Sequence, residues 1–536
     1  MGTSIENSPP IKKQTPGIGR SATLVAAGIL LSRLTGLLRD RVFAHFFGNS
    51  DAADAFRAAF RIPNFLQNLF GEGVLSASFI PVYARLRAQG EDEEAGRVAR
   101  AVASLLVLIT STLVLIGVLA APYITDAIAF GFHGAKRELT IELVRIFFPG
   151  AGLLVMSAWC LGILNSHRKF FLSYVAPVVW NATIIAALIG FGRHHGQSAL
   201  AVYVAWASVV GSGLQFSVQL PVVLRLVRAL RPILGTQLGS VREVIRNFVP
   251  VLFSRGVVQV SAFIDSSIAS ALPTGAVATF AYAQTLYTLP VSLFGMSVSA
   301  AELPAMSGAL GSESEVAAQL RGRLGRGIRQ IAFLVVPSAV AFLTLGDVIA
   351  AAIYQSGKFV HRDAIFVWGV LGGSAVGLLA SSLGRLYSSA YYALRDTRTP
   401  LRFAIVRVAL TTGLGLFFAL RGPGILGIDR LWGTAGLTAS AGIAGWVEFL
   451  LLRWKLHQRI GAVQSAKIFF VKLWIAAALS AGGAWAVKLA AEPRGPIPLA
   501  FIVLLPYGVL YFLITSAMRV PEAQMVIRRL VGLRRT

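Results

Sequence analysis

The sequence predicts an all-α polytopic membrane protein with about fourteen transmembrane helices, arranged as two pseudo-symmetric six-helix lobes plus two C-terminal helices. Three observations predict this class. Of the 536 residues, 55% are hydrophobic and only 14% are charged, and the mean hydropathy is +0.69, whereas soluble domains are about 25% charged. Apolar runs of about 20 residues, the length that a helix needs to cross a bilayer, recur along the whole chain. Basic residues gather after every second run.

Fourteen apolar stretches are long enough to cross a membrane as helices. A transmembrane β-barrel does not fit them, because its strands are alternating segments of only about 10 residues. The first two stretches are interrupted by charged residues. The expected spans are 22–48, 53–83, 99–122, 141–165, 172–192, 199–224, 247–271, 276–306, 327–352, 365–390, 401–420, 431–452, 467–488 and 497–518.

A repeated Ser-Arg pair indicates that the two lobes are related. Ser32-Arg33 and Ser254-Arg255 both stand early in a helix that follows a basic stretch. Repeated lobes around a central site are a common plan of transporters. We expect a cytoplasmic tail at 1–21, an N-terminal six-helix lobe at 22–225, a C-terminal six-helix lobe at 246–455, two additional transmembrane helices at 467–518 and a basic cytoplasmic tail at 519–536.

The connecting loops account for the formal net charge of +25. Clusters of arginine and lysine follow every second span, whereas the intervening loops hold few cations. This is the positive-inside pattern, and it places both termini in the cytoplasm. The charge therefore requires no nucleic-acid partner. The clusters run from Arg85 to Arg100, Arg168 to Lys169, Arg225 to Arg246, Arg321 to Arg329, Arg395 to Arg402, Arg453 to Lys467 and Arg528 to Arg535.

The ends of the chain and its only cysteine suggest no further chemistry. Cys160 excludes an intrachain disulfide, and we expect it to fill apolar space in a helix. Residues 1–20 lack the apolar core of a secretory signal. In the C-terminal tail, Met525, Val526 and Leu530 alternate with arginines, which predicts an amphipathic helix on the anionic inner leaflet. The alternative is a frayed, solvated tail.

The first span carries charged residues inside the expected bilayer. Such residues usually face a wet cavity or a partner, because burying them in lipid is costly. Ser32, Arg33, Arg39 and Asp40 share an arc of about 120° at 100° per residue. Arg33 lies about 18 Å along a helix that begins near Ala22, close to the middle of the bilayer. We expect it to face a cavity, and a structural pair with Asp40 or another acid is the alternative.

The second span adds Asp54, Arg57, Arg61 and Glu72 to the charged set. Arg57 and Arg61 are four residues apart and therefore lie on one helix face, where they would enlarge a cationic patch. Pro63 lacks a backbone donor and predicts a kink in this helix. If the stretch is interfacial instead, both arginines are solvated.

The second lobe contributes Arg255, Asp265 and Glu302. Arg255 lies about 13 Å along a helix that begins near Asn247. At that depth it needs an anion or water unless it pairs with an acid such as Glu302. Asp265 and Glu302 either bind a coupling proton or cation, or they neutralise arginines.

The residue types favour binding over bond-breaking chemistry. The chain contains no phosphate-binding loop, no zinc-spaced Cys/His set and no nucleophile elbow, so we expect a transporter without metal or cofactor. A hydrated cavity lined by arginine suits phosphate or pyrophosphate, because guanidinium offers paired donors and stays charged. We therefore expect an anionic amphiphile to be moved by alternating access. A monovalent cation and the membrane potential both stay open as the source of energy.

The charged segments also carry a family resemblance, which extends over nearly the whole chain. The sequence resembles the MurJ/MviN family of the MOP exporter superfamily. The matching segments are Ser32-Arg33-Leu34-Thr35-Gly36, Arg39-Asp40, Asp54-Ala55-Phe56, Pro63-Asn64, Phe70-Gly71-Glu72-Gly73, Phe79-Ile80-Pro81, Tyr354 to Phe359 and Arg395 to Pro400.

This resemblance implies a fourteen-helix flippase with a V-shaped cationic cavity. Its cargo would be lipid II, the undecaprenyl-pyrophosphate-linked peptidoglycan precursor, moved outward across a bacterial cytoplasmic (inner) membrane. Membrane lipids and cell-wall synthesis proteins are the further partners it implies. The resemblance assigns substrate binding to Ser32, Arg33, Arg39, Asp40, Asp54 and Glu72, and the cavity argument adds Arg57, Arg61 and Arg255.

Two departures from the family pattern leave other functions open. Gln67-Asn68 stands where many members have Arg-Arg, and Thr285 stands where many have arginine. We expect Arg255 to restore one of these charges. The alternatives are a flippase for another polyprenyl-pyrophosphate glycan, a cation-coupled exporter of small solutes, and a membrane scaffold whose charges are structural.

Overall fold

Helices account for nearly all of the computed structural model, which describes residues 17–70, 72–227, 233–308, 312–463, 467–491 and 495–525. Within its helices, the side chains of residues 17–27, 72–73 and 253–262 are outside this description. The predicted amphipathic tail beyond Met525 also lies outside it. In the described segments, extended pairing is limited to one isolated bridge between Ser356 and Phe359.

The first lobe contains six spans, and its second span is broken. Among these helices, α10 packs on α8 and α9, and α1 packs on α9. The helices are α1 (Gly17–Phe47), α2 (Asp51–Ala59), α3 (Arg61–Phe70), α4 (Glu72–Ser78), α5 (Ile80–Ala88), α6 (Asp92–Leu119), α7 (Ala121–Ile128), α8 (Gly134–Ser166), α9 (Phe170–Phe191) and α10 (Gln197–Val227).

The second lobe repeats the order of the first. Its second span is interrupted, and a short helix again follows its third span. The elements are α11 (Gly239–Ser270), α12 (Ala276–Pro290), η1 (Val291–Met296), α13 (Ser297–Ser307), α14 (Glu313–Thr344), α15 (Gly346–Tyr354), α16 (His361–Ala393), α17 (Arg398–Leu416), η2 (Phe417–Arg421), α18 (Gly422–Leu426), η3 (Arg430–Trp432) and α19 (Gly433–Ile460), followed by α20 (Lys467–Ala490) and α21 (Pro496–Ala517).

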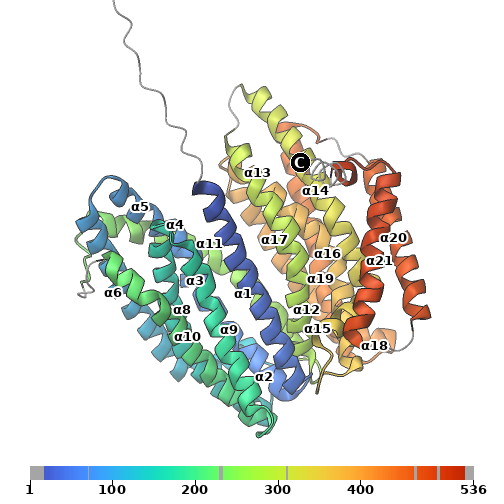
Figure 1. Cartoon of the computed structure of the whole chain (residues 1–536), viewed down its shortest axis with the longest axis horizontal. Helices are drawn as coiled ribbons and strands as arrows, with labels where there is room; N and C mark the ends of the chain where they lie inside the picture. Colours follow the sequence, from blue (N-terminus) through green and yellow to red (C-terminus); the bar gives the residue numbers. More distant parts are fainter. Residues whose placement is uncertain are drawn as a thin grey trace, which may run out of the picture.

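The chain crosses the bundle fourteen times, as predicted. Eleven described helical stretches are long and apolar enough to span a membrane, and α1, the broken stretch α2–α5 and α11 also run between its two ends. We call the end where α1 begins and α21 ends the inner end, and the opposite end the outer end. Figure 1 shows the inner end at the top, with α1–α10 to the left and α12–α21 to the right.

Helix α11 is shared between the two groups of helices. Its inner half packs against α3, α4 and α6, whereas its outer half contacts α12, α17 and α19 of the second lobe and α7 of the first. The sequence places residues 246–455 in one lobe. These lobe boundaries stay a prediction, and the structure adds that α11 links both lobes.

Proline explains the break in the second span. Pro63 is the third residue of α3, and it cannot donate a hydrogen bond to the carbonyl of Ala59, where α2 ends. The helix is therefore interrupted at Phe60. In place of the predicted kink within one helix, the chain passes from α2 to α3 at this position. In the second lobe, the corresponding span passes through the π-helical segment η1 directly after Pro290.

Small residues bring α16 and α19 into close contact. A Cβ atom added at Gly377 would lie 2.3 Å from the Cα atom of Gly442, and one at Gly373 would lie 2.3 Å from the carbonyl oxygen of Ala435. Membrane helices associate through such contacts, because the lipid offers no hydrophobic drive for helix association. Thr438 adds a hydrogen bond of 2.9 Å to the carbonyl oxygen of Val370.

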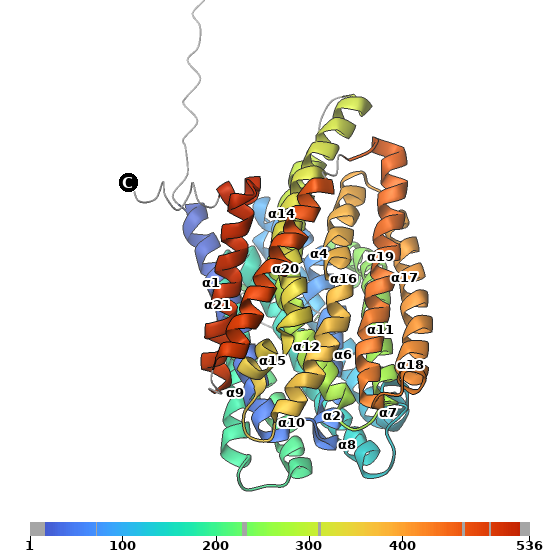
Figure 2. The same cartoon turned by 90° about the vertical axis from the view of Figure 1, so that its right-hand side faces the viewer.

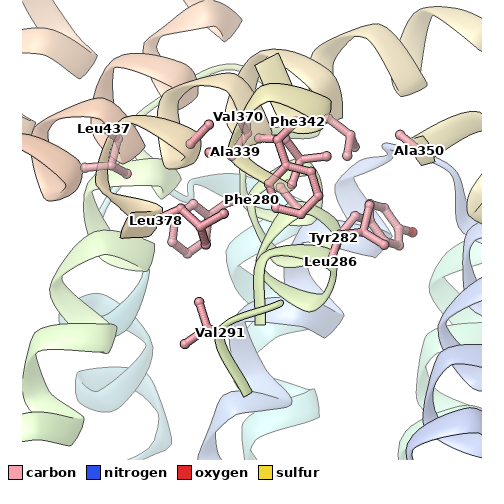
Figure 3. Close-up of a cluster of buried hydrophobic side chains, with 14 of the residues drawn as sticks. Phe280, Tyr282, Leu286, Val291, Ala339, Phe342, Ala350, Val370, Leu378 and Leu437 are labelled. Carbon is pink, nitrogen blue, oxygen red and sulfur yellow. The ribbon is translucent and has the colours of Figure 1, made fainter. Parts of the chain in front are cut away.

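The core of the second lobe surrounds α12. Figure 3 shows Phe280, Tyr282 and Leu286 of α12 beside Phe342 of α14 and Val370 of α16. All five side chains are buried. The interrupted span is therefore packed against α14 and α16.

The last two helices dock onto α14 and α15 (Figure 2). The hydroxyl groups of Tyr507 and Tyr511 donate to backbone carbonyls of α14 at 2.6 and 2.8 Å. Lys488 of α20 lies 2.6 Å from the carboxylate of Asp347 at the start of α15. These polar contacts attach the C-terminal pair to the second lobe.

Candidate substrate site between the lobes

A buried aspartate lies at the centre of the charged residues of α1 and α2. Arg39 and Arg57 both donate to the same oxygen of Asp40, at 3.0 and 3.1 Å. The second oxygen accepts a hydrogen bond of 3.2 Å from the hydroxyl of Thr285 in α12. The residue that departs from the family pattern at this position thus contacts the predicted site from the other lobe.

Aromatic rings orient the two arginines paired with Asp40. The guanidinium of Arg39 lies 5.1 Å from the ring centre of Phe60 and 5.5 Å from that of Trp180, and it donates to the side chain of Asn181 at 3.1 Å. Arg57 lies 4.4 Å from the ring centre of Phe43. Such cation–π contacts strengthen when they are desolvated, so both arginines are held rigidly.

Arg33 differs from these arginines because it is exposed. The sequence leaves open a structural pair with Asp40, but Asp40 is occupied by Arg39 and Arg57. Within the described part of the chain, no carboxylate forms an ion pair with Arg33. Six residues separate Arg33 from Arg39, which corresponds to about 9 Å toward the inner end. Ser32, beside it, is half-buried.

Arg61 and Asp265 face each other across the lobes. Both line a cavity of about 210 Å³, together with Asn64, Phe280 and Gln284. The guanidinium of Arg61 lies 5.3 Å from the ring centre of Phe280. One carboxylate oxygen of Asp265 is buried without a hydrogen-bond partner in the described structure. The cavity therefore combines a cation of the first lobe with an acid of the second.

A second cavity extends from Asp265 into the second lobe. It has a volume of about 100 Å³ and includes Arg407, Ser381 and Thr438. Arg407 is paired with Glu448 at 3.2 Å, and its positive field acts on Asp265 together with that of Arg61. Asp265 thus lies between a cation of each lobe.

Asp54 caps a helix of the opposite lobe. Helix α12 follows Gly275, which has a φ of 91°, and the first amides of a helix need acceptors. The carboxylate of Asp54 accepts from the amide of Gly275 at 2.8 Å and from that of Ala278 at 2.7 Å. Lys136 of α8 lies 2.6 Å from the same carboxylate. Asp54 therefore joins the two lobes at the outer end.

Arg41 makes a matching contact at the end of a second-lobe helix. Its guanidinium donates to the carbonyl oxygens of Ala352 and Ile353, in the last turn of α15, at 2.7 and 2.8 Å. A cation at a helix C-terminus complements the helix dipole. Arg41 of the first lobe is therefore held in a cross-lobe contact.

The backbone itself also closes the outer end. The amide of Lys358 donates to the carbonyl of His45 at 2.8 Å, and the hydroxyl of Tyr282 donates to the carbonyl of Gly48 at 3.0 Å. Gly48 has a φ of 55°, and a Cβ atom there would lie 2.6 Å from the carbonyl oxygen of Lys358. We call these contacts, with those of Asp54 and Arg41, the outer gate.

Other predicted site residues lie apart from this cluster or outside the description. Glu302 of α13 lies 3.5 Å from Arg323 of α14, within the second lobe. Helix α11 contains Arg255 and α4 begins at Glu72, but the side chains of both are outside the described part of the structure. The predicted compensation by Arg255 and the substrate contact of Glu72 therefore stay predictions.

Sequence reasoning missed Lys136, Asn181 and the cap formed by Asp54. Lys136 and Asn181 lie more than 80 residues from their partners in the chain. Neither residue stands out in composition or spacing. The position of Asp54 near a helix start gave only a weak signal, since its acceptor role depends on a helix of the other lobe.

A two-lobed bundle of fourteen spans, with a charged site between the lobes and a closed outer end, defines the class of alternating-access membrane transporters. The model of the family described as lipid II flippase MurJ matches residues 43–520. The chain belongs to this family.

Curated relatives support the same assignment. The chain is 32% identical over 510 residues to the lipid II flippase MurJ of Burkholderia cenocepacia, covering 92% of this chain and 96% of that protein. It is 32% identical over 443 residues to the probable lipid II flippase MurJ of Rhizobium meliloti, covering 80% of this chain and 78% of that protein.

Solved structures show the same fold. A structure of lipid II flippase MurJ in an inward closed conformation matches with a TM-score of 0.77 and 23% identity, over 92% of this chain and 98% of that one. An inward-facing multidrug-resistance MATE transporter of the MOP superfamily matches with a TM-score of 0.63 and 19% identity, over 82% of this chain and 98% of that one. The predicted fold class is confirmed.

Proposed function

We propose that this chain moves lipid II from the inner to the outer leaflet of a bacterial inner membrane by alternating access. Its pyrophosphate would bind the arginines between the lobes. Both termini would lie in the cytoplasm, as the positive-inside pattern predicts. The single observation that carries this proposal is the excess of cations on the inner side of a closed outer gate.

The balance of charge between the lobes suits a pyrophosphate. Among the described side chains, the arginines of this cluster are accompanied by the carboxylates of Asp40 and Asp265; the arginines are Arg33, Arg39, Arg57 and Arg61. The cluster therefore has a formal excess of two positive charges, and a pyrophosphate diester carries two negative charges. Arginine retains its charge in a partly desolvated site and can bind an oxyanion through two donors.

The arrangement of the chain suggests how the substrate acts on the gate. Asp40 holds both Arg39 and Arg57, and it contacts Thr285 across the lobes. An anion that draws Arg39 away from Asp40 would weaken the contacts directly beneath the outer gate. Binding energy would thereby favour the state that opens outward.

Asp265 is the stronger candidate for coupling to an ion or to the membrane potential. Its carboxylate lines both central cavities and has one buried oxygen without a hydrogen-bond partner among the described residues. Glu302 also has a buried oxygen without a hydrogen-bond partner among the described residues, but that oxygen lies 3.5 Å from Arg323, and Glu302 lines neither cavity. We therefore favour Asp265 over Glu302 as the group that binds a coupling proton or cation.

A second candidate function is the transport of another polyprenyl-pyrophosphate glycan. Thr285 favours this alternative because it brings no charge to the site where many family members have arginine. The pyrophosphate part of the site would be unchanged. Contact with cell-wall synthesis proteins stays a prediction of the resemblance.

Complementation tests the proposal. In a bacterial strain depleted of its lipid II flippase, the wild-type chain should restore growth, whereas Arg39→Ala should not. Arg39→Lys should restore growth in part, since it keeps the charge but loses the paired donors. Failure of a well-expressed wild-type chain, combined with transport of a different lipid-linked glycan in vesicles, would favour the second candidate.

A further inference from the structure

An apolar cavity of about 350 Å³ lies outside the charged site, between α3, α4, α6 and α11. Its lining is entirely apolar and includes Phe70, Leu75, Leu106 and Phe248. None of the arginines or acids of the substrate site contributes to the lining. The cavity is therefore distinct from the charged transport site already described.

The cavity lies at the depth of the inner leaflet. Helices α6 and α11 both begin at the inner end, and the lining residues run over 102–109 of α6 and 244–252 of α11. Each stretch extends about 10–12 Å along its helix axis. This length fits within one leaflet, which is about 15 Å of the 30 Å hydrocarbon core.

The rim of the cavity is open to the surroundings of the bundle. Ile109, Ile245 and Val249 line the cavity and are also 40%, 41% and 46% exposed. Leu75 and Leu106 at the opposite side are buried at 1% and 3%. The cavity is thus a pocket with a closed apolar floor and an apolar entrance between α6 and α11.

Two arginines stand beside this entrance at the inner end. Arg242, Ile245, Arg246 and Val249 follow the i, i+3, i+4, i+7 spacing of one helix face, and all four are exposed. The neighbouring acid, Glu243, is paired with Arg85 at 2.6 Å. In the described part of the chain, no carboxylate forms an ion pair with Arg242 or Arg246. This face of α11 therefore presents two cations beside the apolar entrance of the pocket.

We propose that this pocket binds an acyl chain of an anionic glycerophospholipid from the inner leaflet, with the lipid phosphate on Arg242 and Arg246. The charge matches the phosphate, and the spacing lets one lipid contact the cations and the pocket together. Phe70 in the pocket is nine residues, or about 13 Å, from Arg61 of the substrate site, so the long polyprenyl chain of the substrate is the competing occupant.

The bound lipid would stabilise α11 on the first lobe. The inner half of α11 meets α3, α4 and α6 at the pocket, while its outer half contacts the second lobe and α7 of the first lobe. A chain that fills the pocket adds apolar contact to the inner half alone. Anionic lipid therefore favours the arrangement in which α11 and the first lobe remain together.

Binding of fluorescent phosphatidylglycerol to the purified full-length protein tests the proposal, with phosphatidylcholine as the neutral comparison. The double variant Arg242→Gln/Arg246→Gln should weaken phosphatidylglycerol binding by about 10- to 30-fold, since each nearby cation contributes to anionic-lipid affinity. The matched control is Arg398→Gln/Arg402→Gln, an exposed pair with the same spacing at the inner end of α17. The control should bind within about twofold of wild type.

A second variant tests the pocket itself. Ile109→Trp fills the rim from an exposed position, so the fold should tolerate it, and phosphatidylglycerol binding should fall while both arginines remain. A specific site would be refuted if the double variant at Arg242 and Arg246 and the control at Arg398 and Arg402 lost equal phosphatidylglycerol affinity. Equal affinity of the wild-type protein for phosphatidylglycerol and phosphatidylcholine would refute it too. Displacement of phosphatidylglycerol from this pocket by a polyprenyl pyrophosphate at equal concentration would show that the substrate tail is the occupant and would overturn the proposal.

Discussion

The carboxylate of Asp54 accepts a hydrogen bond from the backbone amide of Ala278 at 2.7 Å, although the two residues belong to different lobes. A second hydrogen bond reaches the amide of Gly275 at 2.8 Å. The start of a helix carries free amides and a partial positive charge. Separation of the lobes at the outer end would therefore expose these amides and leave Asp54 with Lys136 alone.

We expect Asp54→Asn to shift the protein toward an outward-open state. Asparagine keeps one acceptor but loses the charge, and hydrogen bonds to a charged group contribute about 1.5–3 kcal/mol. The open population should rise about tenfold or more. Double electron–electron resonance would measure this population from the distance between spin labels at His194 and Arg362. Both positions are exposed at the outer end, and they lie on different lobes.

Asp51→Asn is the matched control for this experiment. Asp51 also contacts Lys136, at 3.0 Å, but its side chain is 60% exposed and it does not cap α12. Its effect should be smaller. Cys160 is buried, so it should not take up label. An unchanged distance distribution in Asp54→Asn would contradict the capping role.

Arg57 and Arg33 should respond differently to alanine. Arg57 is 7% exposed and paired with Asp40, and breaking a buried pair costs about 3–5 kcal/mol. Arg33 is exposed, so Arg33→Ala should change stability by about 0.5 kcal/mol or less and still abolish transport. Thermal unfolding in detergent and a vesicle flipping assay would separate the two effects. Normal transport by Arg33→Ala would remove Arg33 from the substrate site.

Asp265→Asn should uncouple transport from its driving force. The variant keeps the shape of the side chain but cannot bind a proton or cation as a carboxylate does. In proteoliposomes, an imposed ion gradient or potential that accelerates the wild-type protein should no longer accelerate Asp265→Asn. Glu302→Gln should retain the response, because Glu302 is engaged with Arg323. The opposite result would assign coupling to Glu302.

The packing of α16 on α19 should not tolerate a side chain at Gly377. An added Cβ atom lies 2.3 Å from the Cα atom of Gly442, so Gly377→Ala should destabilise the protein by about 1–3 kcal/mol. Gly384 lies two turns further along α16 and has no atom within 4 Å of an added Cβ. Gly384→Ala should be neutral or stabilising, because alanine favours helix. Equal melting temperatures of the two variants would contradict the close contact.

The sequence by itself determined the number of spans and the alternation of basic loops with loops that hold few cations. Each depends on local properties, since a run of apolar residues forms a span wherever it stands and a loop cation acts through its own charge. Pro63 likewise predicted a kink near the point where the helix is interrupted, because a missing amide is a property of that residue alone. The charged arc of α1 was visible for the same reason, as it follows from helical periodicity.

Only the tertiary structure decided what each charge contacts. Arg33 and Arg39 share one face of α1, yet Arg39 is paired with Asp40 while Arg33 is exposed. Asp54 caps α12 of the other lobe, a contact that its own helix does not reveal, and its substrate role stays a prediction. These outcomes depend on distances of about 3 Å between residues that are up to 224 positions apart. Neither periodicity nor composition encodes such distances, because they arise only when the two lobes pack against each other.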